Sequence, residues 1–408
     1  MKVLLIHQVF TPPTSPGGTR HYELARAAQS RGHEFTIIAS DISYKTGERT
    51  VDGVRLSTRQ DIDGIHVERA YTYPSLHQSF MWRVVAFLSF MTTSLIVGLR
   101  QPRSDVVMGT TPPIFQAVST ALIAAIWRVP FLLEVRDLWP EFAIDIGVLR
   151  NPLLIRLARW LESFLYARAS HILVNSPAYR DYLLARGIAP AKISLVANGV
   201  DPDMFNPDAD GSSVRARWAP NAKYIVTYAG AMGMANDLST LLQAAAQLRA
   251  FPEIQFWLVG DGKDRTQLEA LARELELTNV RFTGTIPKNE LSAVFGASDA
   301  CLATLKDIPM FRTTYPNKVF DYMAAGKPTV LAIDGVIRSV IEESEGGIFV
   351  PPGNPDALAA TLLAMSRNPA AGVQMGRNAR AYVVRHFNRH DQALQFVALL
   401  ERLAARGD

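Results

Sequence analysis

Lys318 and Asp321 stand three residues apart in residues 315–330, a stretch typical of a short helix with Pro316 in its first turn. Side chains at this spacing share one side of a helix. An ammonium group and the free amides of a helix N-terminus, here near Asn317, bind phosphate oxygens, and a carboxylate accepts from a ribose hydroxyl. The stretch therefore predicts a nucleotide site, with an ordinary surface ion pair as the alternative.

A second group of charged residues, Arg136, Asp137 and Glu141, follows the apolar run 131–135. In a doubly wound α/β sheet, ligands bind beyond the carboxyl ends of the strands. We therefore expect Arg136 and Asp137 to belong to a catalytic site. A purely structural ion pair between Arg136 and Asp137 is the alternative.

The elements that must position these residues follow a repeated pattern. A strand at 3–6 leads into a proline- and glycine-rich loop with Gly17 and Gly18, and a helix follows. The same order restarts at 224–233, where a strand runs into Gly230 and Gly233. Glycines let the backbone approach a ligand closely, although a flexible turn is the plain alternative. The pattern predicts two α/β domains of the Rossmann-like, doubly wound kind.

Length and composition agree with two domains. The 408 residues are 48% hydrophobic and 20% charged, which is typical of a globular protein and not of a disordered one. A proline-punctuated run after residue 198 reads as a linker. We expect a first domain at 1–200, a second at 201–385 and a terminal helix at 386–408.

Charge and cysteine content limit the function classes. The chain carries a net charge of +4, and the basic excess lies in residues 1–200. This favours an anionic partner such as a lipid headgroup or a diphosphate. Nucleic acid is disfavoured because the basic residues are scattered and no DNA-binding motif is present. The single cysteine, Cys301, sits in an apolar strand-like run, which predicts a buried, inert thiol. No cluster of acidic or histidine residues predicts a metal.

Residues 84–99 are uncharged and mostly apolar, with Arg83 and Arg100 at either end. A bilayer-spanning helix needs about twenty such residues, so this run is short for that role. It fits either a packed domain helix or an interfacial helix with its arginines at the headgroups. The basic amphipathic stretch 153–160 supports the interfacial interpretation. The chain opens directly on a strand with no charged leader, so we expect a cytoplasmic protein.

The stretch 315–330 resembles the C-terminal signature of the family 4 glycosyltransferases, and the resemblance covers nearly the whole chain. In that family two glutamates stand eight residues apart, and the second holds the donor's ribose. Thr313 and Asp321 occupy the two places here. The resemblance implies the GT-B architecture, in which two Rossmann-like domains face a cleft and the terminal helix packs back on the first domain. Gly17 and Gly18 match the glycine pair that faces this cleft.

The resemblance also implies where the donor binds. Family members carry a cation near the place of Met232 and a lysine at the place of Asn236, both on the diphosphate. Neither cation is present here. The diphosphate is therefore expected to rely on amides between Gly230 and Gly233 and on Lys318. Residues Gly284, Thr285 and Ile286 are expected at the nucleobase, without a metal or other cofactor.

At the end of the first-half strand, Arg136 replaces the family's histidine and Asp137 keeps its carboxylate. This motif resembles a branch that builds surface polysaccharides such as O-antigen and lipopolysaccharide, including enzymes that transfer N-acetylfucosamine. It implies retaining transfer from a UDP-linked sugar to a polyprenyl-diphosphate-linked saccharide, at the inner face of the cytoplasmic membrane. A nucleotide-sugar epimerase and a non-catalytic nucleotide-binding subunit are the alternatives.

Overall fold

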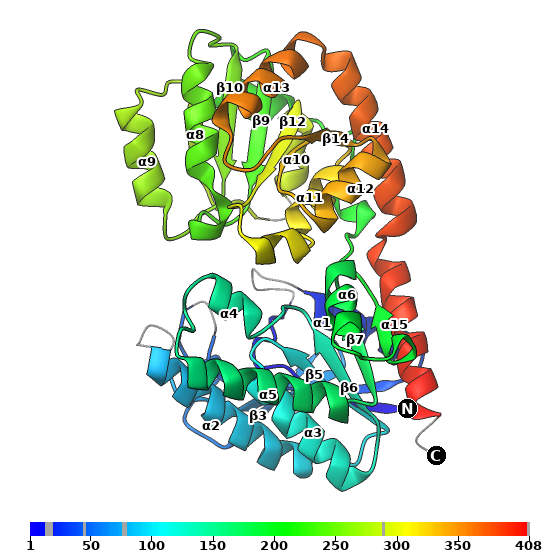
Figure 1. Cartoon of the computed structure of the whole chain (residues 1–408). Helices are drawn as coiled ribbons and strands as arrows, with labels where there is room; N and C mark the ends of the chain where they lie inside the picture. Colours follow the sequence, from blue (N-terminus) through cyan, green and yellow to red (C-terminus); the bar gives the residue numbers. More distant parts are fainter. Residues whose placement is uncertain (13–18, 44–45, 76–79, 288–289, 406–408) are drawn as a thin grey trace. The chain divides into compact units, whose positions relative to one another are not determined.

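The computed structural model describes residues 1–12, 19–43, 46–75, 80–287 and 290–405. The chain divides into two units. The first comprises Met1–Ala197 together with the C-terminal segment from His390, and the second comprises Asn198–Arg389. Each unit is a parallel sheet with helices on both faces (Figure 1). The domain change therefore falls between Ala197 and Asn198, three residues before the position expected from the linker composition.

The described residues of the first unit form an eight-stranded sheet in the order β3-β4-β2-β1-β5-β6-β7-β8. Apart from the β3–β4 hairpin, whose turn is Asp63-Gly64, neighbouring strands are parallel. The strands are β1 Lys2–Ile6, β2 Glu34–Ser40, β3 Ser57–Ile62, β4 Ile65–Ala70, β5 Val106–Thr111, β6 Phe131–Val135, β7 His171–Val174 and β8 Ile193–Leu195.

The helices of this unit cover the two faces of its sheet (Figure 1). They are α1 Arg20–Ser30, α2 Phe80–Leu99, α3 Phe115–Trp127, α4 Glu141–Asp145, α5 Pro152–Arg168 and α6 Pro177–Ala185, with η1 Pro190–Lys192. The C-terminal helix α15, Arg389–Ala404, adds Phe396 and Leu400 to a core cluster shared with strands of the first unit.

The described residues of the second unit form a six-stranded sheet in the order β11-β10-β9-β12-β13-β14. Its strands are β9 Tyr224–Ala229, β10 Ile254–Val259, β11 Val280–Gly284, β12 Ala300–Thr304, β13 Thr329–Ala332 and β14 Gly347–Phe349. Its helices are α7 Ser212–Trp218, α8 Leu238–Gln247, α9 Arg265–Glu274, α10 Leu291–Ala297, α11 Asn317–Ala324, α12 Val336–Ser344, α13 Pro355–Arg367 and α14 Pro369–His386, with η2 Pro202–Met204, η3 Met234–Asn236 and η5 Pro309–Thr313.

Each sheet has one place where the direction of strand addition reverses. In the first unit this place lies between β1 and β5, and in the second it lies between β9 and β12. At such a point the loops after the two strands leave in opposite directions, so a crevice opens at the carboxyl ends. The strand order thus selects the loops after β1, β5, β9 and β12 as the places for ligands.

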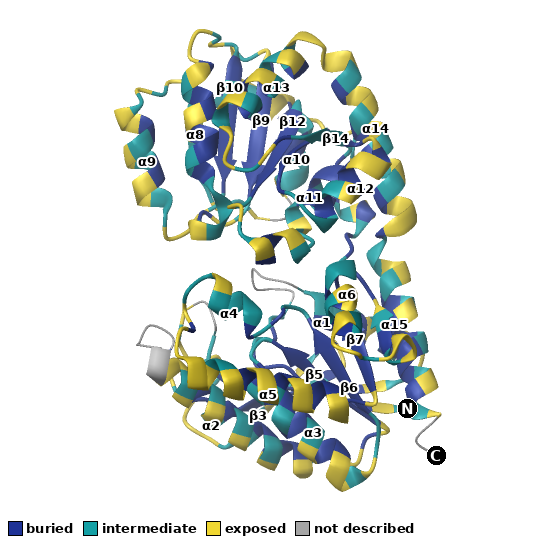
Figure 2. Ribbon diagram, in the orientation of Figure 1, coloured by how far each residue is buried: buried dark blue, intermediate teal, exposed yellow. Residues whose placement is uncertain are grey.

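Burial bears on two expectations, the inert thiol of Cys301 and the apolar run at 84–99 (Figure 2). Cys301 is fully buried on β12, and burial raises the pKa of its thiol to about 12, which confirms an inert thiol. The helix that contains the apolar run 84–99 is α2, which begins four residues before the run, at Phe80. By length and composition, Trp82–Leu99 is the one described helix segment apolar enough to cross a membrane, and 28% of it is buried.

Candidate functional site

Lys318 lies in the first turn of α11 and reaches back to the end of β9. Its ammonium donates to the Tyr228 hydroxyl at 2.8 Å and to Asn236 Oδ1 at 2.7 Å, and it lies 4.3 Å from the centre of the Tyr228 ring. The structure therefore brings together two predicted donor-binding residues, Lys318 and Asn236, that are 82 positions apart in the chain.

The packing of α11 fixes the place of this ammonium. The apolar face of the helix is fully buried and consists of Val319, Phe320, Tyr322 and Met323. The Tyr322 hydroxyl accepts from the Ala229 amide and donates to the Ala229 carbonyl, at 2.8 and 3.1 Å. These two bonds tie the helix to the last residue of β9, so Lys318 is held directly above the loop that follows.

The partners of Lys318 are both neutral. Burial lowers the pKa of its ammonium to about 7, and no carboxylate opposes this effect. A buried cation without a counter-ion is unfavourable unless an anion joins it. The arrangement is therefore suited to a ligand that brings negative charge, such as a diphosphate.

Glycine is required in the loops around this lysine. A Cβ atom on Gly230 would lie 3.3 Å from Lys318 Nζ, and a Cβ on Gly260 would lie only 2.0 Å from the Gly230 carbonyl oxygen. A Cβ on Gly262 would lie 2.2 Å from the carbonyl oxygen of Met232. The loops after β9 and β10 therefore pack backbone against backbone, which leaves room for the ammonium.

The structure corrects the prediction for Met232. Its side chain is fully buried in the core of the second unit. Its amide donates to the Asp261 carbonyl at 2.8 Å, and its carbonyl accepts from the Asp264 amide at 3.0 Å. Met232 therefore has no free group for a donor. The Gly230 amide is also engaged, with the Val259 carbonyl at 2.9 Å.

Two amides of the same loop are left for an anion. Within the described chain, neither the Ala231 nor the Gly233 amide donates to a backbone or side-chain acceptor. A Cβ on Gly233 would meet no atom within 4 Å, so the backbone there borders open space. Of the four amides between Gly230 and Gly233 that were expected to bind an anion, only those of Ala231 and Gly233 are therefore available among the described residues.

The other predicted donor residues lie around this loop. Asn317 is exposed at the start of α11, and Asp321 is half-buried one turn further on. Gly284 accepts from the Gly260 amide at 2.9 Å, which joins the end of β11 to the glycine loops. Thr285 is exposed and Ile286 is half-buried directly after it.

Thr313, at the place of the family's first glutamate, uses its hydroxyl locally. The hydroxyl donates to the Met310 carbonyl at 2.6 Å within η5, the short helix that precedes α11. A short polar side chain bonded to its own helix cannot reach a sugar as a glutamate does. Its contribution is therefore to the shape of η5.

In the first unit, Arg136 and Asp137 follow β6. The Arg136 Nε donates to the Thr111 carbonyl at 3.3 Å, and Asp137 accepts from the Tyr179 hydroxyl. Arg136 and Asp137 are not joined by a salt bridge, but the charge of each acts on the pKa of the other. Burial raises the pKa of Asp137 to about 6.

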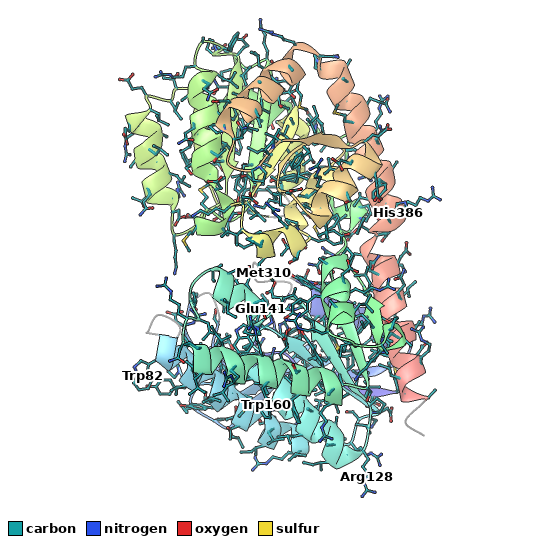
Figure 3. The ribbon with its side chains drawn as sticks, viewed as in Figure 1. Trp82, Arg128, Glu141, Trp160, Met310 and His386 are labelled. Atoms are coloured by element: carbon teal, nitrogen blue, oxygen red, sulfur yellow. The ribbon has the colours of Figure 1, made fainter. Side chains whose placement is uncertain are left out.

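Glu141 is separated from this pair. Glu141, labelled in Figure 3, starts α4. It binds Arg159 on α5 at 2.9 Å and Arg186 just after α6 at 3.3 Å. The two arginines fully occupy its carboxylate. Glu141 therefore ties three helices together and does not belong with Arg136 and Asp137. Gly17 and Gly18 lie outside the described residues.

Sequence reasoning missed the buried group beside Arg136, formed by His7, Arg20, His21 and Glu134. Glu134 is fully buried on β6 and binds Arg20 Nε at 2.9 Å and His21 Nε2 at 2.6 Å. Its signal in the sequence is a single charge inside the apolar run Phe131–Val135. Charged residues are rarely fully buried unless they are paired.

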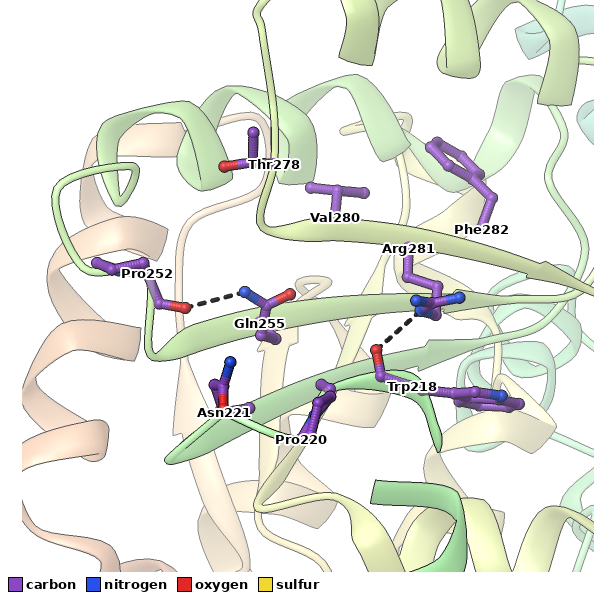
Figure 4. Close-up of a pocket in the computed structure, with 11 residues that line it drawn as sticks. Trp218, Pro220, Asn221, Pro252, Gln255, Thr278, Val280, Arg281 and Phe282 are labelled. Atoms are coloured by element: carbon purple, nitrogen blue, oxygen red, sulfur yellow. Dashed lines mark hydrogen bonds between the residues drawn. The ribbon is translucent and has the colours of Figure 1, made fainter. Parts of the chain in front are cut away.

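A hollow of about 480 Å³ lies on the second unit, at the edge opposite the carboxyl ends of its strands (Figure 4). Its lining includes Trp218, Gln255 and Arg281, at the amino ends of β10 and β11. The Arg281 Nε donates to the Trp218 carbonyl at 3.1 Å. None of the predicted site residues lines it. Among the described residues, no group of His, Cys, Asp and Glu is arranged to hold a metal ion.

Two Rossmann-like units with switch points at the carboxyl ends of their strands are the GT-B fold, and solved structures agree. Sucrose-phosphate synthase from Thermosynechococcus elongatus superposes with a TM-score of 0.77 and 20% identity, over 99% of each chain. Anabaena HepE in complex with UDP-glucose superposes with a TM-score of 0.70 and 19% sequence identity, over 98% of this chain and 100% of HepE. The predicted fold class is confirmed.

Two domain families match the chain. Residues 17–199 match the "Glycosyl transferase 4-like domain" and residues 213–382 match "Glycosyl transferases group 1". Both units of the chain therefore carry glycosyltransferase-type domains.

Sequence relatives have the same class. The chain is 22% identical over 412 residues to the putative colanic acid biosynthesis glycosyl transferase WcaI of Escherichia coli, which covers 97% of this chain and 99% of WcaI. It is 27% identical over 269 residues to the probable glycosyltransferase WbjE of Pseudomonas aeruginosa, which covers 64% of this chain and 66% of WbjE.

Proposed function

We propose that this glycosyltransferase moves a sugar from a UDP-linked donor to a saccharide carried on polyprenyl diphosphate, with retention, in the synthesis of a surface polysaccharide. The observation that carries the proposal is Lys318. Its ammonium lies at the switch point of the second unit and has only neutral partners, beside a loop in which two amides have no acceptor among the described residues. Such a place recognises a diphosphate.

The chemistry follows from that arrangement. The bond between the anomeric carbon and the donor's diphosphate oxygen breaks, and the acceptor oxygen bonds to that carbon on the same face. The acceptor's proton passes to the departing diphosphate. Negative charge grows on the leaving group, and fixed amides with a lysine ammonium stabilise it where it appears. Two carboxylates flanking the sugar, as in hydrolases, are not needed.

Relatives support the nucleotide and the pathway class. HepE was solved with UDP-glucose, WcaI is named for colanic acid and an Erwinia amylovora relative, AmsK, for amylovoran. The Arg136-Asp137 motif favours an N-acetylated deoxyamino sugar such as fucosamine as the transferred group. Asp137, with its buried carboxylate, is proposed to accept from a hydroxyl of the donor sugar or of the acceptor.

A lipid-linked acceptor requires that the enzyme work at a membrane surface, and one face of the first unit supports this. Helix α3 packs against both α2 and α5. The three helices expose large apolar side chains that include Trp82, Leu88, Leu122, Ile126, Leu157 and Trp160. Figure 3 marks Trp82 on α2 and Trp160 on α5. We call this set of three helices the α2–α3–α5 face.

The charged residues on the α2–α3–α5 face indicate which kind of surface it binds. Arg83, Arg100, Arg128 and Arg156 are exposed on or beside its helices, and the only acidic residue within them, Glu162, is buried. An apolar surface with exposed arginines and no exposed acid is complementary to an anionic bilayer, where basic residues near the surface each contribute about 1 kcal/mol. We therefore propose peripheral binding at the cytoplasmic face of the membrane.

A screen for released UDP tests the function. Wild-type protein is incubated with UDP-linked sugars and polyprenyl-diphosphate saccharides, in all pairs and with each donor alone. UDP release that needs both partners, with a product carrying one more sugar, is the expected result. Isomerisation of a donor without acceptor would instead identify an epimerase. Binding of UDP with no turnover of any pair would contradict the proposal.

A further inference from the structure

The carboxyl ends of adjacent strands in the first unit carry polar groups that lack partners. His7 follows β1, Thr111 ends β5 and Asn175 follows β7, and all three are more than nine-tenths buried. Four side-chain atoms have no hydrogen-bond partner among the described residues. They are both ring nitrogens of His7, the hydroxyl oxygen of Thr111 and the side-chain amide oxygen Oδ1 of Asn175. Strands β1, β5, β6 and β7 are consecutive in the sheet, so these groups line one edge that includes its switch point.

Among these groups, His7 has two buried polar atoms without a partner. It is 4% exposed, and its ring centre lies 4.2 Å from that of His21. Burial, with the repulsion that a protonated His7 would meet from His21 and Arg136, holds the pKa of His7 well below its usual value, so the imidazole is neutral. A neutral imidazole offers one donor and one acceptor. Leaving both unused in the interior costs about 1–3 kcal/mol each, which a bound partner removes.

The residues behind His7 form a set that fixes its neighbour. Although burial opposes it, His21 and Arg20 hold the pKa of Glu134 well below its usual value, so Glu134 is an ionised acceptor. His21 Nε2 must then be the donor across the 2.6 Å to Glu134. Arg20 also donates to the Val196 and Ala197 carbonyls, at 2.9 and 3.0 Å. His21 is thereby locked in one orientation beneath the His7 ring.

The charges of this edge cancel. Arg20 is paired with Glu134, and Arg136 stands next to Asp137, whose carboxylate is ionised above a pKa of about 6. With both histidines neutral, the cluster has no excess charge. A phosphate would need a net cation. Unused imidazole, hydroxyl and amide groups match the donors and acceptors of a neutral polyhydroxyl group instead.

We propose that His7 binds a saccharide hydroxyl through its two free ring nitrogens, with Arg20, His21 and Glu134 as positioning residues that hold the imidazole in place. This inference rests on the proposed function, since it names a residue that touches one of the two saccharides of the transfer. The hydroxyl belongs either to the donor's sugar or to the lipid-linked acceptor. Both have the same chemistry, and the experiment separates them.

The first measurement observes His7 directly. The imidazole signals of full-length protein labelled with ¹⁵N-histidine are assigned by their loss in His7→Gln. UDP alone, UDP-glucose, UDP-N-acetylglucosamine and a short-chain polyprenyl-diphosphate N-acetylglucosamine are then added in turn. We expect the His7 signals to move with a sugar-bearing probe and not with UDP. Movement with the UDP-sugars assigns the hydroxyl to the donor, and movement with the lipid-linked probe assigns it to the acceptor.

His171 supplies the matched control. It is 6% exposed on β7 of the same sheet, at the amino end of that strand, and its Nε2 is 2.8 Å from the Ser194 hydroxyl. Its signals should stay fixed with every probe. If the His7 signals also stay fixed while wild-type protein releases UDP from a donor and acceptor pair, the inference is wrong and the proposed function stands. If no pair releases UDP but His7 responds to sugars, the function fails and the binding role stands.

A second variant separates binding from structure. His7→Phe keeps a ring and removes the two polar nitrogens, so its melting temperature should equal or exceed that of wild type. Its kcat/KM for transfer should fall roughly 10- to 100-fold, while UDP binding stays unchanged. His7→Gln, which restores a donor and an acceptor, should recover part of the rate. A lower melting temperature in His7→Phe with an unchanged transfer rate would show that the histidine is merely structural.

Discussion

Lys318 Nζ and Asn236 Oδ1 lie 2.7 Å apart, in a hydrogen bond that joins the first turn of α11 to the loop after β9. Where the resemblance leads one to expect a lysine, the amide of Asn236 accepts from a lysine that comes from another helix. The positive charge at this place is therefore supplied by one side chain. We therefore expect binding of the donor's diphosphate to depend on the Lys318 ammonium.

Replacing Lys318 with alanine should weaken UDP binding. The variant loses a charge-assisted bond to phosphate, worth about 1.5–3 kcal/mol, so Kd should rise roughly 10- to 150-fold. Isothermal titration calorimetry with UDP measures this Kd. Lys223→Ala is the matched control, because Lys223 is exposed at the opposite, amino end of β9. Equal affinities in the Lys318→Ala variant and wild type would contradict the assignment.

The affinity for UDP should fall as pH rises above about 7. Burial lowers the Lys318 pKa to about 7 in the free protein, and a diphosphate beside it favours the charged form. Above that pH, binding must take up a proton, so Kd rises by up to about tenfold per pH unit. Titrations at pH 8 in buffers of different ionisation enthalpy should reveal proton uptake. A constant affinity from pH 7 to 9 would exclude a titrating ammonium at the site.

Asn236→Asp should change the pH profile and the affinity together. A carboxylate at 2.7 Å from the ammonium raises the pKa of Lys318, which flattens the pH dependence between 7 and 9. The same carboxylate neutralises the charge that UDP needs, so binding at pH 7 should be weaker. Asp208→Asn, a change at an exposed position in the linker region, should alter neither property. A steeper pH dependence in Asn236→Asp would be inconsistent with the bond seen here.

Asp137→Asn should lose transfer activity and gain stability at neutral pH. Burial raises the pKa of Asp137 to about 6 from 3.8, so the folded state binds more protons than the unfolded state between these values. Stability therefore falls as pH rises from about 4 to 6, and the penalty persists above 6. Removing the charge should return about 1–3 kcal/mol at pH 7 and nothing below pH 4.

Denaturant unfolding at pH 4 and pH 7 measures the stability change of Asp137→Asn, and UDP release measures the activity. Asp181→Asn, on the exposed side of α6, controls for the loss of one acidic residue. A fully active Asp137→Asn variant would remove Asp137 from the catalytic site.

Acidic substitutions on the α2–α3–α5 face should release the protein from anionic vesicles. Leu157 and Trp160 are 52% and 63% exposed on α5, and each apolar side chain of this size contributes about 1.5–3 kcal/mol when buried in the bilayer interface. The double variant Leu157→Glu, Trp160→Glu should sediment with vesicles at least tenfold less than wild type. Val373→Glu, equally exposed at 55% on α14, should bind as wild type does. Unchanged sedimentation of the double variant would rule out this face.

The sequence by itself determined the elements and many of the residues that matter. Strand, glycine loop and helix recur with clear periodicity, so two doubly wound units and a short helix within residues 315–330 were predicted and are present. These features depend on neighbours within a few positions, which a sequence displays directly. The burial of Met232 and the ion pairs of Glu141 were not evident, because a position next to a motif does not reveal which way the side chain points or what binds it.

Only the tertiary structure decided which residues meet. Lys318 bonds to Asn236 across 82 positions, and His21 bonds to Glu134 across 113. Such pairs arise from the order of strands in the sheets, which brings the ends of β1 and β6, or of β9 and the start of α11, to one edge. That order is a balance of many burial terms across a whole unit. No local pattern encodes it, and for this reason the buried His7 and its free nitrogens became visible only in the folded chain.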